Sequence, residues 1–407
     1  MEEKKTWDLI SISSIPLVMT LGNSMLIPVL PTIEKELHIS SLQSSLIITV
    51  YSVVAILLIP VAGYLSDRLG RKKIIIPSLI IAGVGGLISG FASWLLPHPY
   101  WLILVGRLLQ GVGASGAFPV VLPLVGDMFK NEQEVSSSLG MVETSNTFGK
   151  VVSPILGGFL ASLIWFLPFL SIPLFCLISV LLVLFLVKTP QKQEEPQPFK
   201  EFLQSVKQIF GQKGRWLYAV FLIGAIFMFV LFGVLFFLST VLQDHYGIKG
   251  TLKGLILAAP LLALSLTAYI TGKKIGQNKP LMKKLTLIGC ALLAATILCV
   301  SFIQQITMFI VVFVAGGVGI GLVLPCLDAF ITEGIEKEQR GTVSSIYSSM
   351  RFIGVALGPP LFAMLMKLSH KTLFLSITGV CIVAVLLALW AIKPAGQVKK
   401  ERLKPIS

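Results

Sequence analysis

The sequence predicts an all-α integral membrane protein with twelve transmembrane helices arranged as two six-helix bundles. Three observations lead to this fold class. The 407 residues are 55% hydrophobic and only 13% charged, with a mean hydropathy of +0.88, which does not fit a protein whose surface faces water. The chain contains twelve apolar runs that are long enough to cross a bilayer. A long polar stretch divides these runs into two sets of six.

Each run is predicted as a helix because about 20 mostly apolar residues span the hydrocarbon core of a membrane. Polar connectors bound the runs, from the charged residues at the N-terminus to a basic tail after the last run. The first six runs cover residues 9–30, 43–64, 74–96, 100–125, 138–160 and 163–187. The second six cover residues 216–240, 252–272, 284–303, 307–330, 341–366 and 371–392.

The cations are distributed unequally between the two sides of the membrane. Most of the 33 Lys and Arg residues lie at the N-terminus and in the even-numbered connectors. The odd-numbered connectors hold only Lys35, Lys249, Lys253, Lys367 and Lys371. Because short cytoplasmic loops are rich in Lys and Arg, both termini of this multi-pass protein are expected to be cytoplasmic and its location to be the cell membrane. The excess of cations that gives the formal charge of +14 thus sets the orientation of the chain in the membrane. It does not indicate a nucleic-acid partner.

The polar stretch between the two sets defines the domain organisation. We expect an N-terminal six-helix bundle at residues 1–187, a cytoplasmic linker at 188–215, and a C-terminal six-helix bundle with a basic cytoplasmic tail at 216–407. Apolar residues of the linker recur at helical spacing, which favours an amphipathic helix on the membrane surface. They are Phe199, Phe202, Leu203, Val206, Ile209 and Phe210. A solvated tether without fixed structure is the alternative.

Two sequence patterns recur in corresponding spans of the two sets. Gly-Val-Gly at 111–113 returns at 317–319, and Gly149-x4-Pro154 returns as Gly354-x4-Pro359, where Gly358 precedes the proline. Parallel repeats of this kind predict a cavity at the membrane midplane and rocking between two open states. The small residues and prolines are expected to serve helix packing and kinking.

The connector after the second span carries the most specific motif. Its sequence, Gly63-Tyr-Leu-Ser-Asp67-Arg68-Leu-Gly70-Arg71-Lys-Lys-Ile, resembles the GxLaDRxGRkxx signature of the major facilitator superfamily. The alternative interpretation, a loop that is basic only because it faces the cytoplasm, explains the cations of this motif. It does not explain Asp67 or the two glycines. Gly63 is expected to permit close helix approach and Gly70 a tight turn.

The resemblance also implies a role for this loop. In that family the loop latches one gating state, so Asp67, Arg68 and Arg71 are expected to do so here. Asp127, which closes the fourth span, is the expected internal partner.

Two further stretches are similar to family motifs. Residues 107–114, from Arg107 to Ala114, match the RxxqGxga pattern of the fourth span, which implies that Arg107 takes part in proton coupling. Structural pairing of this buried arginine is the alternative. Residues 149–158 resemble the gxxxGPxxGG signature of drug:proton antiporters, with Ser153 in place of a glycine. The packing and kink residues there are Gly149, Ser153, Pro154, Gly157 and Gly158.

The resemblance covers essentially the whole chain and implies the major facilitator fold and a function. The chain is similar to twelve-helix drug:proton antiporters, a group with multidrug, tetracycline-type and siderophore exporters. It is expected to be a monomeric secondary transporter that exports a small organic molecule by alternating access. A proton gradient is the expected energy source, with no cofactor or metal. An importer of the same fold and a non-transporting membrane receptor are the alternatives. An enzyme is disfavoured because no paired catalytic carboxylates, metal cluster or nucleophile motif is present.

Polar residues inside the apolar spans mark the expected cavity. Glu143, Asn146, Lys150 and Pro154 fall on one helical face of the fifth span, and Arg351 and Asn23 are prominent polar residues of the eleventh and first spans. The substrate-cavity candidates are Asn23, Arg107, Asn146, Lys150 and Arg351.

Proton coupling requires a carboxylate whose proton affinity rises on burial and falls beside a cation. Glu143 is the first candidate and Asp328, nearer a span end, is the second. A fixed salt bridge is the alternative for each.

The charge and the aromatic residues of the spans suggest a substrate class. Three cavity cations against two carboxylates leave a small positive charge, which favours an anionic or polar substrate. Phenylalanines of the seventh span can stack on an aromatic ligand, although most are expected to serve packing or to face lipid. They are Phe227, Phe229, Phe232, Phe236 and Phe237. A catecholate siderophore such as bacillibactin suits a cationic, aromatic-lined cavity.

Overall fold

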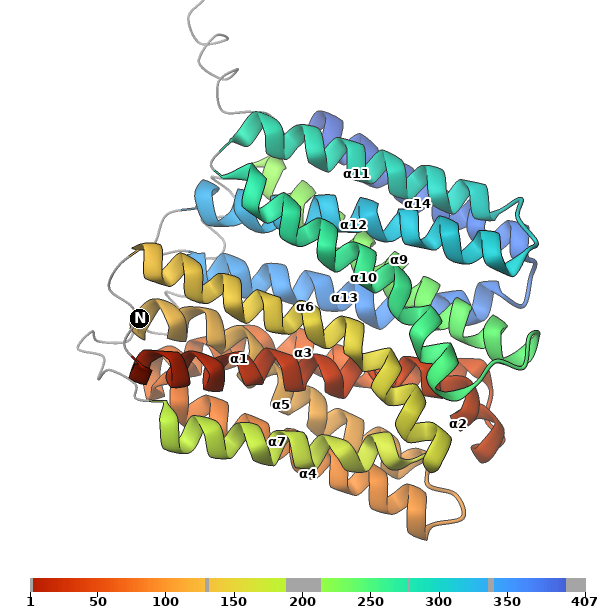
Figure 1. The fold of residues 1–407 in the computed structure, drawn as a ribbon, viewed down its shortest axis with the longest axis horizontal. Coiled ribbons are helices and arrows are strands. Elements are labelled where there is room, and N and C mark those ends of the chain that lie inside the picture. The colour runs from red at the N-terminus through yellow and green to blue at the C-terminus, as the bar shows by residue number, and fades with distance from the viewer. Residues whose placement is uncertain (1–2, 129–131, 188–213, 277, 336–339, 393–407) are drawn as a thin grey trace, which may run out of the picture. The chain divides into compact units, whose positions relative to one another are not determined.

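The computed structural model describes residues 3–128, 132–187, 214–276, 278–335 and 340–392 (Figure 1). Within these ranges every regular element is a helix, which confirms the predicted all-α class. The predicted linker, with its amphipathic helix, lies outside the described residues apart from its last two positions, and so does the basic tail after residue 392.

The helices follow the predicted runs in number and order. The first run corresponds to α1 (Glu3–Ser24), η1 (Ile27–Val29) and α2 (Leu30–Leu37). The next six runs correspond to α3 (Ser41–Leu69), α4 (Arg71–Leu95), α5 (Tyr100–Met128), α6 (Glu132–Leu163), α7 (Leu167–Leu186) and α9 (Arg215–Asp244). The remaining described helices are α10 (Gly250–Ile275), α11 (Lys279–Val300), α12 (Ile306–Gly334), α13 (Arg340–Leu365) and α14 (His370–Trp390).

The first predicted run is not one continuous helix, which corrects the prediction for residues 9–30. The α-helix ends at Ser24, a 3-10 turn follows at Ile27–Val29, and α2 then continues to Leu37. Pro28 and Pro31 lie in the first turns of these two short elements. Proline lacks a backbone N–H and cannot continue the hydrogen bonding of the preceding helix, which accounts for the break.

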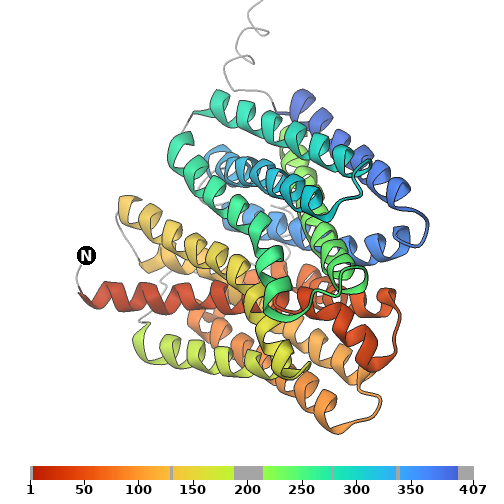
Figure 2. The ribbon, with the colours of Figure 1, turned by 45° about the vertical axis from the view of Figure 1, so that its right-hand side comes forward.

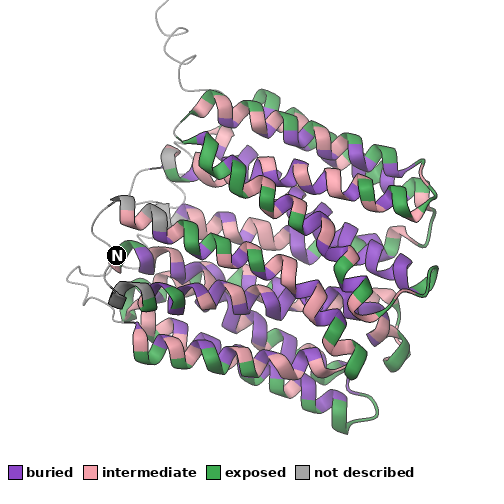
Figure 3. Cartoon of the chain, viewed as in Figure 1, coloured by how far each residue is buried: buried purple, intermediate pink, exposed green. Residues whose placement is uncertain are grey.

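Eleven helical segments among the described residues are long and apolar enough to cross a membrane, which shows a multi-pass membrane protein. Helix α6 covers the predicted fifth span but is not among them, because Glu143, Asn146 and Lys150 make one of its faces polar. Exposed residues recur along the helices, including α4 and α7 (Figure 3), and many of them are large and apolar. Leu57 and Phe185, for example, are 68% and 73% exposed. Lipid is the solvent that suits such a surface.

The described residues form two compact units. One unit contains those up to Val187 together with Met228–Ala258 and Ser344–Lys367. The other contains those from 214 to Phe227, Ala259–Val343 and those from Leu368 onward. The first unit thus combines segments from both predicted halves. The division into bundles at 1–187 and 216–407 stays a prediction.

The first unit is built around α5. This helix packs against α4, α3 and α1, and α4 packs against α7, beside which it lies in both views (Figures 1 and 2). Buried apolar residues such as Ile12, Leu79, Val121 and Ile172 form its core. Helix α6 packs along α1 and contributes to the wall of the cavity described below. In the second unit α11 packs between α12 and α14.

Candidate functional site

A cavity lies inside the first unit, between α1, α3, α5, α6, α9 and α13. It contains about 680 Å³ of space free of protein atoms, counting the part open to solvent. The cavity is concave and is lined by side chains from six helices, as sites for small organic molecules commonly are.

Four of the five predicted cavity residues lie in its wall. They are Asn23 on α1, Asn146 and Lys150 on α6, and Arg351 on α13. No Asp or Glu is among the described residues that line it. The wall therefore carries two cationic side chains and no carboxylate. Contact of these residues with a substrate stays a prediction.

The rest of the wall combines aromatic and small polar side chains. Of the five phenylalanines predicted on α9, only Phe232 is among the described lining residues. Tyr51 and Phe352 also line the cavity, with their ring centroids 6.3 Å apart. The sequence did not single these two out, because aromatic residues are frequent in apolar spans and nothing local marks one that faces a cavity. The hydroxyls of Thr20 and Ser348 add polar groups to the same wall.

Arg107 is not a lining residue but lies fully buried behind the wall. Its Nε donates to the carbonyl oxygen of Ile47 at 2.8 Å and its Nη2 to Oδ1 of Asn23 at 2.9 Å. Its Nη1 donates to the carbonyl oxygen of Gly22 at 3.1 Å and also to Oε1 of Gln110. All these acceptors are neutral, so the guanidinium joins α1, α3 and α5 by hydrogen bonds rather than by an ion pair.

Arg107 also acts on two residues that do line the cavity. Besides holding the amide of Asn23, its Cζ lies 4.5 Å from the centroid of the Tyr51 ring, a cation–π contact. This geometry fits the structural alternative for Arg107. It also makes Arg107 a positioning residue for the cavity wall.

Glu143, the first proton-coupling candidate, is exposed and does not line the cavity. Its Oε1 accepts a hydrogen bond from Nδ2 of Asn146 at 3.1 Å. Oδ1 of Asn146 in turn accepts one from the Thr20 hydroxyl at 2.6 Å. Since Asn146 and Thr20 both line the cavity, a chain of two hydrogen bonds connects the Glu143 carboxylate to the wall.

Asp328, the second candidate, lies half-buried on α12 in the other unit. The structure therefore does not bring it into the cavity of the first unit. Glycines of the same helix serve packing in that unit, where Gly317 lies against Pro260 and Gly321 against Leu264 of α10.

The small residues of the predicted antiporter motif bring α6 close to two helices. A side chain at Gly157 would overlap the carbonyl oxygen of Met25, and one at Gly158 would overlap that of Gly250 at the start of α10. Ser153, the departure from the motif, donates to the carbonyl oxygens of Gly149 at 2.6 Å and Thr20 at 3.4 Å. The hydroxyl thus fits where the motif has a glycine and adds a contact with α1. Pro154 lies within α6 and its carbonyl faces Gly254 of α10.

The corresponding residues of the eleventh span pack in a similar way. Gly354, Gly358 and Pro359 are buried on α13. A Cβ at Gly358 would lie 2.7 Å from the carbonyl oxygen of Phe229 on α9, too close for a side chain. The glycine is therefore needed for the approach of α13 to α9.

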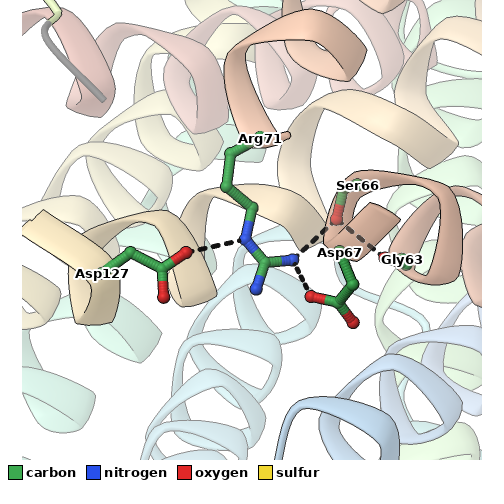
Figure 4. Close-up of polar contacts among 5 residues, drawn as sticks. All are labelled: Gly63, Ser66, Asp67, Arg71 and Asp127. Carbon is green, nitrogen blue, oxygen red and sulfur yellow. Dashed lines mark hydrogen bonds and ion pairs between the residues drawn. The ribbon is translucent and has the colours of Figure 1, made fainter. Parts of the chain in front are cut away.

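The loop between α3 and α4 forms the polar cluster shown in Figure 4. Arg71 contacts Oδ2 of Asp127 through Nε at 3.0 Å and Oδ1 of Asp67 through Nη1 at 2.5 Å. Nη1 also donates to the Ser66 hydroxyl at 2.7 Å, which donates to the carbonyl oxygen of Gly63 at 2.8 Å. The arginine thus joins the end of α3, the start of α4 and the end of α5. Asp127 lies where the sequence placed the loop's partner.

The two glycines of the motif differ in how strictly they are required. Gly70, between α3 and α4, has a φ of 102°, which residues with a side chain rarely adopt. A Cβ at Gly63 would meet the Ser345 hydroxyl of α13 at 3.4 Å, an ordinary contact distance, so an alanine fits there in this conformation. Arg68 is exposed.

A lysine of the same motif has a role that the sequence did not suggest. Nζ of Lys72 donates to the carbonyl oxygens of Leu184 and Val187, both at 2.8 Å. These carbonyls belong to the end of α7, which carries the negative end of the helix dipole. Lys72 therefore caps α7 and ties it to the loop.

Replacing Arg71 with alanine is expected to slow transport while changing the stability of the fold by no more than about 1 kcal/mol. The small stability effect follows from the exposure of its partners, since the Asp67 and Asp127 side chains are 49% and 36% exposed. Initial transport rates and thermal melting of the purified protein check this expectation. An unchanged rate in Arg71→Ala would contradict a gating role, and Arg68→Ala is the control for loss of a basic residue of the same loop.

Comparisons with known proteins agree with this arrangement. A family model described as Major Facilitator Superfamily matches residues 12–282 and 282–406. The chain is 56% identical over 386 residues to the "Bacillibactin exporter" of Bacillus subtilis (strain 168), with 95% of this chain and 96% of the relative covered. It is 28% identical over 392 residues to "Multidrug resistance protein 2" of the same organism, with 94% of each chain covered. The crystal structure of the human organic anion transporter MFSD10 (TETRAN) has a similar fold, with a TM-score of 0.75 at 16% identity over 95% of this chain and 100% of the other.

Proposed function

Because the chain belongs to the Major Facilitator Superfamily, we propose that it exports a small anionic, aromatic molecule by alternating access, driven by a proton gradient. The protein is a multi-pass membrane transporter and not an enzyme. The following observations support the two proposed properties, the chemical class of the substrate and the coupling of transport to protons.

The charge of the cavity carries the proposal. Lys150 and Arg351 supply positive charge from α6 and α13, and the described wall has no Asp or Glu. In a site of low dielectric, each cation attracts an anionic ligand more strongly than it does in water. Tyr51, Phe232 and Phe352 provide faces on which an aromatic ring can stack. A ligand that combines a negative charge with aromatic rings matches both properties.

A catecholate siderophore is the first substrate to test. The relative with 56% identity is named for export of bacillibactin, and the alignment covers almost the full length of both chains. Catecholates are aromatic and become anionic when their hydroxyls lose protons, which is the chemistry that the cavity wall suits.

Proton coupling through Glu143 follows from its connection to the wall. Protonation of its carboxylate removes the negative charge beside the Asn146 amide, three residues further along α6, and so weakens the hydrogen bond between them. Asn146 lines the cavity beside Lys150, so the protonation state of Glu143 alters the groups that a substrate meets. Asp328 lies in the other unit and is not among the described residues that line the cavity, so it is the second candidate.

Orientation and assembly complete the proposal. The distribution of Lys and Arg among the connectors supports a cytoplasmic position for both termini. A monomer is the proposed functional form, since all described residues of the cavity wall come from one compact unit of a single chain.

Transport by purified protein in liposomes tests the function. A pH gradient, acid inside, is expected to drive bacillibactin into vesicles through molecules whose cytoplasmic face points outward. Addition of bacillibactin is expected to move protons in the opposite direction. Movement of protons and siderophore in the same direction would instead identify an importer. A receptor is identified by binding without either movement.

Replacing Glu143 with glutamine is expected to abolish uphill accumulation of the siderophore while leaving its exchange intact. Glutamine retains the hydrogen-bonding oxygen for Asn146 but cannot take up a proton, so coupling is lost and the cavity is kept. Accumulation of labelled siderophore under a pH gradient and exchange of labelled for unlabelled siderophore measure the two properties. Glu36→Gln, an exposed acid on α2, is the control. Retained uphill accumulation in Glu143→Gln excludes this residue as the coupling group.

A further inference from the structure

A buried lysine lies at the start of α10, away from the cavity. Lys253 is 1% exposed, although the sequence places it in a connector beside the exposed Lys249. Its Nζ donates to Oε1 of Gln243 on α9 at 2.6 Å. The same amide oxygen accepts a hydrogen bond from the Thr32 hydroxyl of α2 at 3.1 Å. One amide therefore joins α2, α9 and α10 around a buried ammonium group.

Neighbouring contacts extend this junction along α9. One turn earlier, the Ser239 hydroxyl donates to the carbonyl oxygen of Ile27 at 3.1 Å. On the exposed side, Nζ of Lys35 lies 2.7 Å from Oδ1 of Asp244. The last turns of α9 are thus joined to residues 27–35 by two hydrogen bonds and an ion pair at successive positions along α9. All these residues belong to the same compact unit.

The position of Lys253 makes its burial costly. A buried ammonium group loses its hydration, and a neutral amide compensates for this less well than a carboxylate does. Lys253 also lies in the first turn of α10, where the helix dipole is unfavourable for a cation. The charged groups that act on it are one anion, Asp244, and two cations, Lys35 and Lys249. Any arrangement that admits water to Nζ is therefore favoured by the hydration of this group.

The junction lies where alternating access requires movement. It joins residues 27–35 of the predicted first half to residues 239–253 of the predicted second half, on the side that the Lys and Arg distribution assigns to the exterior. In the structure the junction is closed. Opening of this side separates α2 from α9 and lets water reach Lys253.

We propose, resting on the alternating access of the proposed function, that Lys253 and Gln243 form a buried-charge latch that sets how readily the outer side opens. The hydrogen bond to Gln243 holds the closed state. Hydration of the Lys253 ammonium favours the open state. Gln243 therefore shifts the equilibrium between the closed and open states of the outer side toward the closed state, and Lys253 shifts it toward the open state.

Opposed effects of the two partners give the test. Lys253→Met replaces the ammonium with an apolar group of similar length and is expected to favour the closed state. Gln243→Leu leaves the ammonium without its amide acceptor and is expected to favour the open state. Gln243→Glu supplies a carboxylate partner and is expected to favour the closed state. Each change is expected to alter the opening equilibrium about tenfold, since hydrogen bonds to charged groups contribute enough for that factor.

A cysteine at position 239 reports opening. Ser239 is 0% exposed in the closed state, so Ser239→Cys reacts with a membrane-impermeant maleimide only when the outer side opens. The exposed native Cys299 is replaced by serine, and thermal melting of each variant verifies folding. Labelling in liposomes is expected to be about tenfold slower in Lys253→Met and Gln243→Glu and about tenfold faster in Gln243→Leu.

The control and the contradicting results are distinct. Lys35→Gln removes the exposed ion pair with Asp244 and is expected to change labelling by less than about threefold. Labelling that changes in the same direction in Lys253→Met and Gln243→Leu, or that is unchanged in Lys253→Met and Gln243→Glu, overturns the latch. Because labelling needs no substrate, failure of the wild-type protein to export bacillibactin overturns the proposed function separately.

Discussion

Replacing both Lys150 and Arg351 with glutamine is expected to reduce export of an anionic siderophore by about a hundredfold or more. Each single replacement is expected to cost about tenfold, because a hydrogen bond from a charged group contributes roughly 1.5 to 3 kcal/mol. The two side chains come from α6 and α13 and meet in the wall of one cavity. Loss of both leaves a wall without a charged side chain among the described lining residues.

Transport of substrates of both charges measures this effect. Initial rates at several concentrations of bacillibactin separate weaker binding from slower turnover. A lipophilic cation is expected to be transported better by the double variant than by the wild-type protein, since repulsion by the wall is removed. Lys371→Gln, an exposed cation outside the cavity, is the control. An unchanged rate with the anion in the double variant would falsify the assignment of these two cations to substrate binding.

Replacing Arg107 with alanine is expected to destabilise the protein by about 3 to 5 kcal/mol, because each buried acceptor left without a donor costs about 1 to 3 kcal/mol. Four acceptors on three helices lose their donor, and the Asn23 and Tyr51 side chains lose the group that orients them. Substrate affinity is expected to fall together with stability, because both lining residues are then less well positioned.

The lysine variant at this position distinguishes structure from proton coupling. Arg107→Lys keeps the charge but offers one nitrogen with three donors, which cannot reach acceptors on α1 and α3 with the geometry of a guanidinium. A positioning role therefore predicts a fall in melting temperature and in substrate affinity for Arg107→Lys. A role in coupling alone predicts an intact melting temperature with loss of proton movement. Arg68→Ala, which changes an exposed arginine, is the control for melting.

The parts of the site that were predicted from the sequence are polar residues inside apolar spans. Asn23, Asn146, Lys150 and Arg351 stand out locally because a polar group in a membrane helix is costly unless it faces water or a partner. Tyr51 and Phe352 have no such signal, since an aromatic residue fits lipid, core and cavity equally well. Which of them faces the cavity depends on the packing of helices that are far apart in the sequence.

Two ionisable residues show why burial of a charge could not be predicted. Lys253 lies at the boundary between the connector that holds Lys249 and an apolar run, and hydropathy does not distinguish a solvated lysine there from a buried one bonded to Gln243 of α9. Glu143 lies inside an apolar run, yet it is exposed, and a hydrogen bond with Asn146 links it to the cavity. In both cases the environment is set by neighbouring helices rather than by the residues beside them in the chain.

The sequence by itself determined the membrane class, the order of the spans, the loop motif and the family, because the length of an apolar run and the spacing of a motif are local properties of the chain. The tertiary structure alone decided that Arg107 lies behind the cavity wall, that Glu143 is not among the described lining residues, and that Lys253 is buried with a hydrogen bond to Gln243. The reason is physical: the free energy of a charged group depends on the water and the partners around it, and in this protein those partners come from other helices.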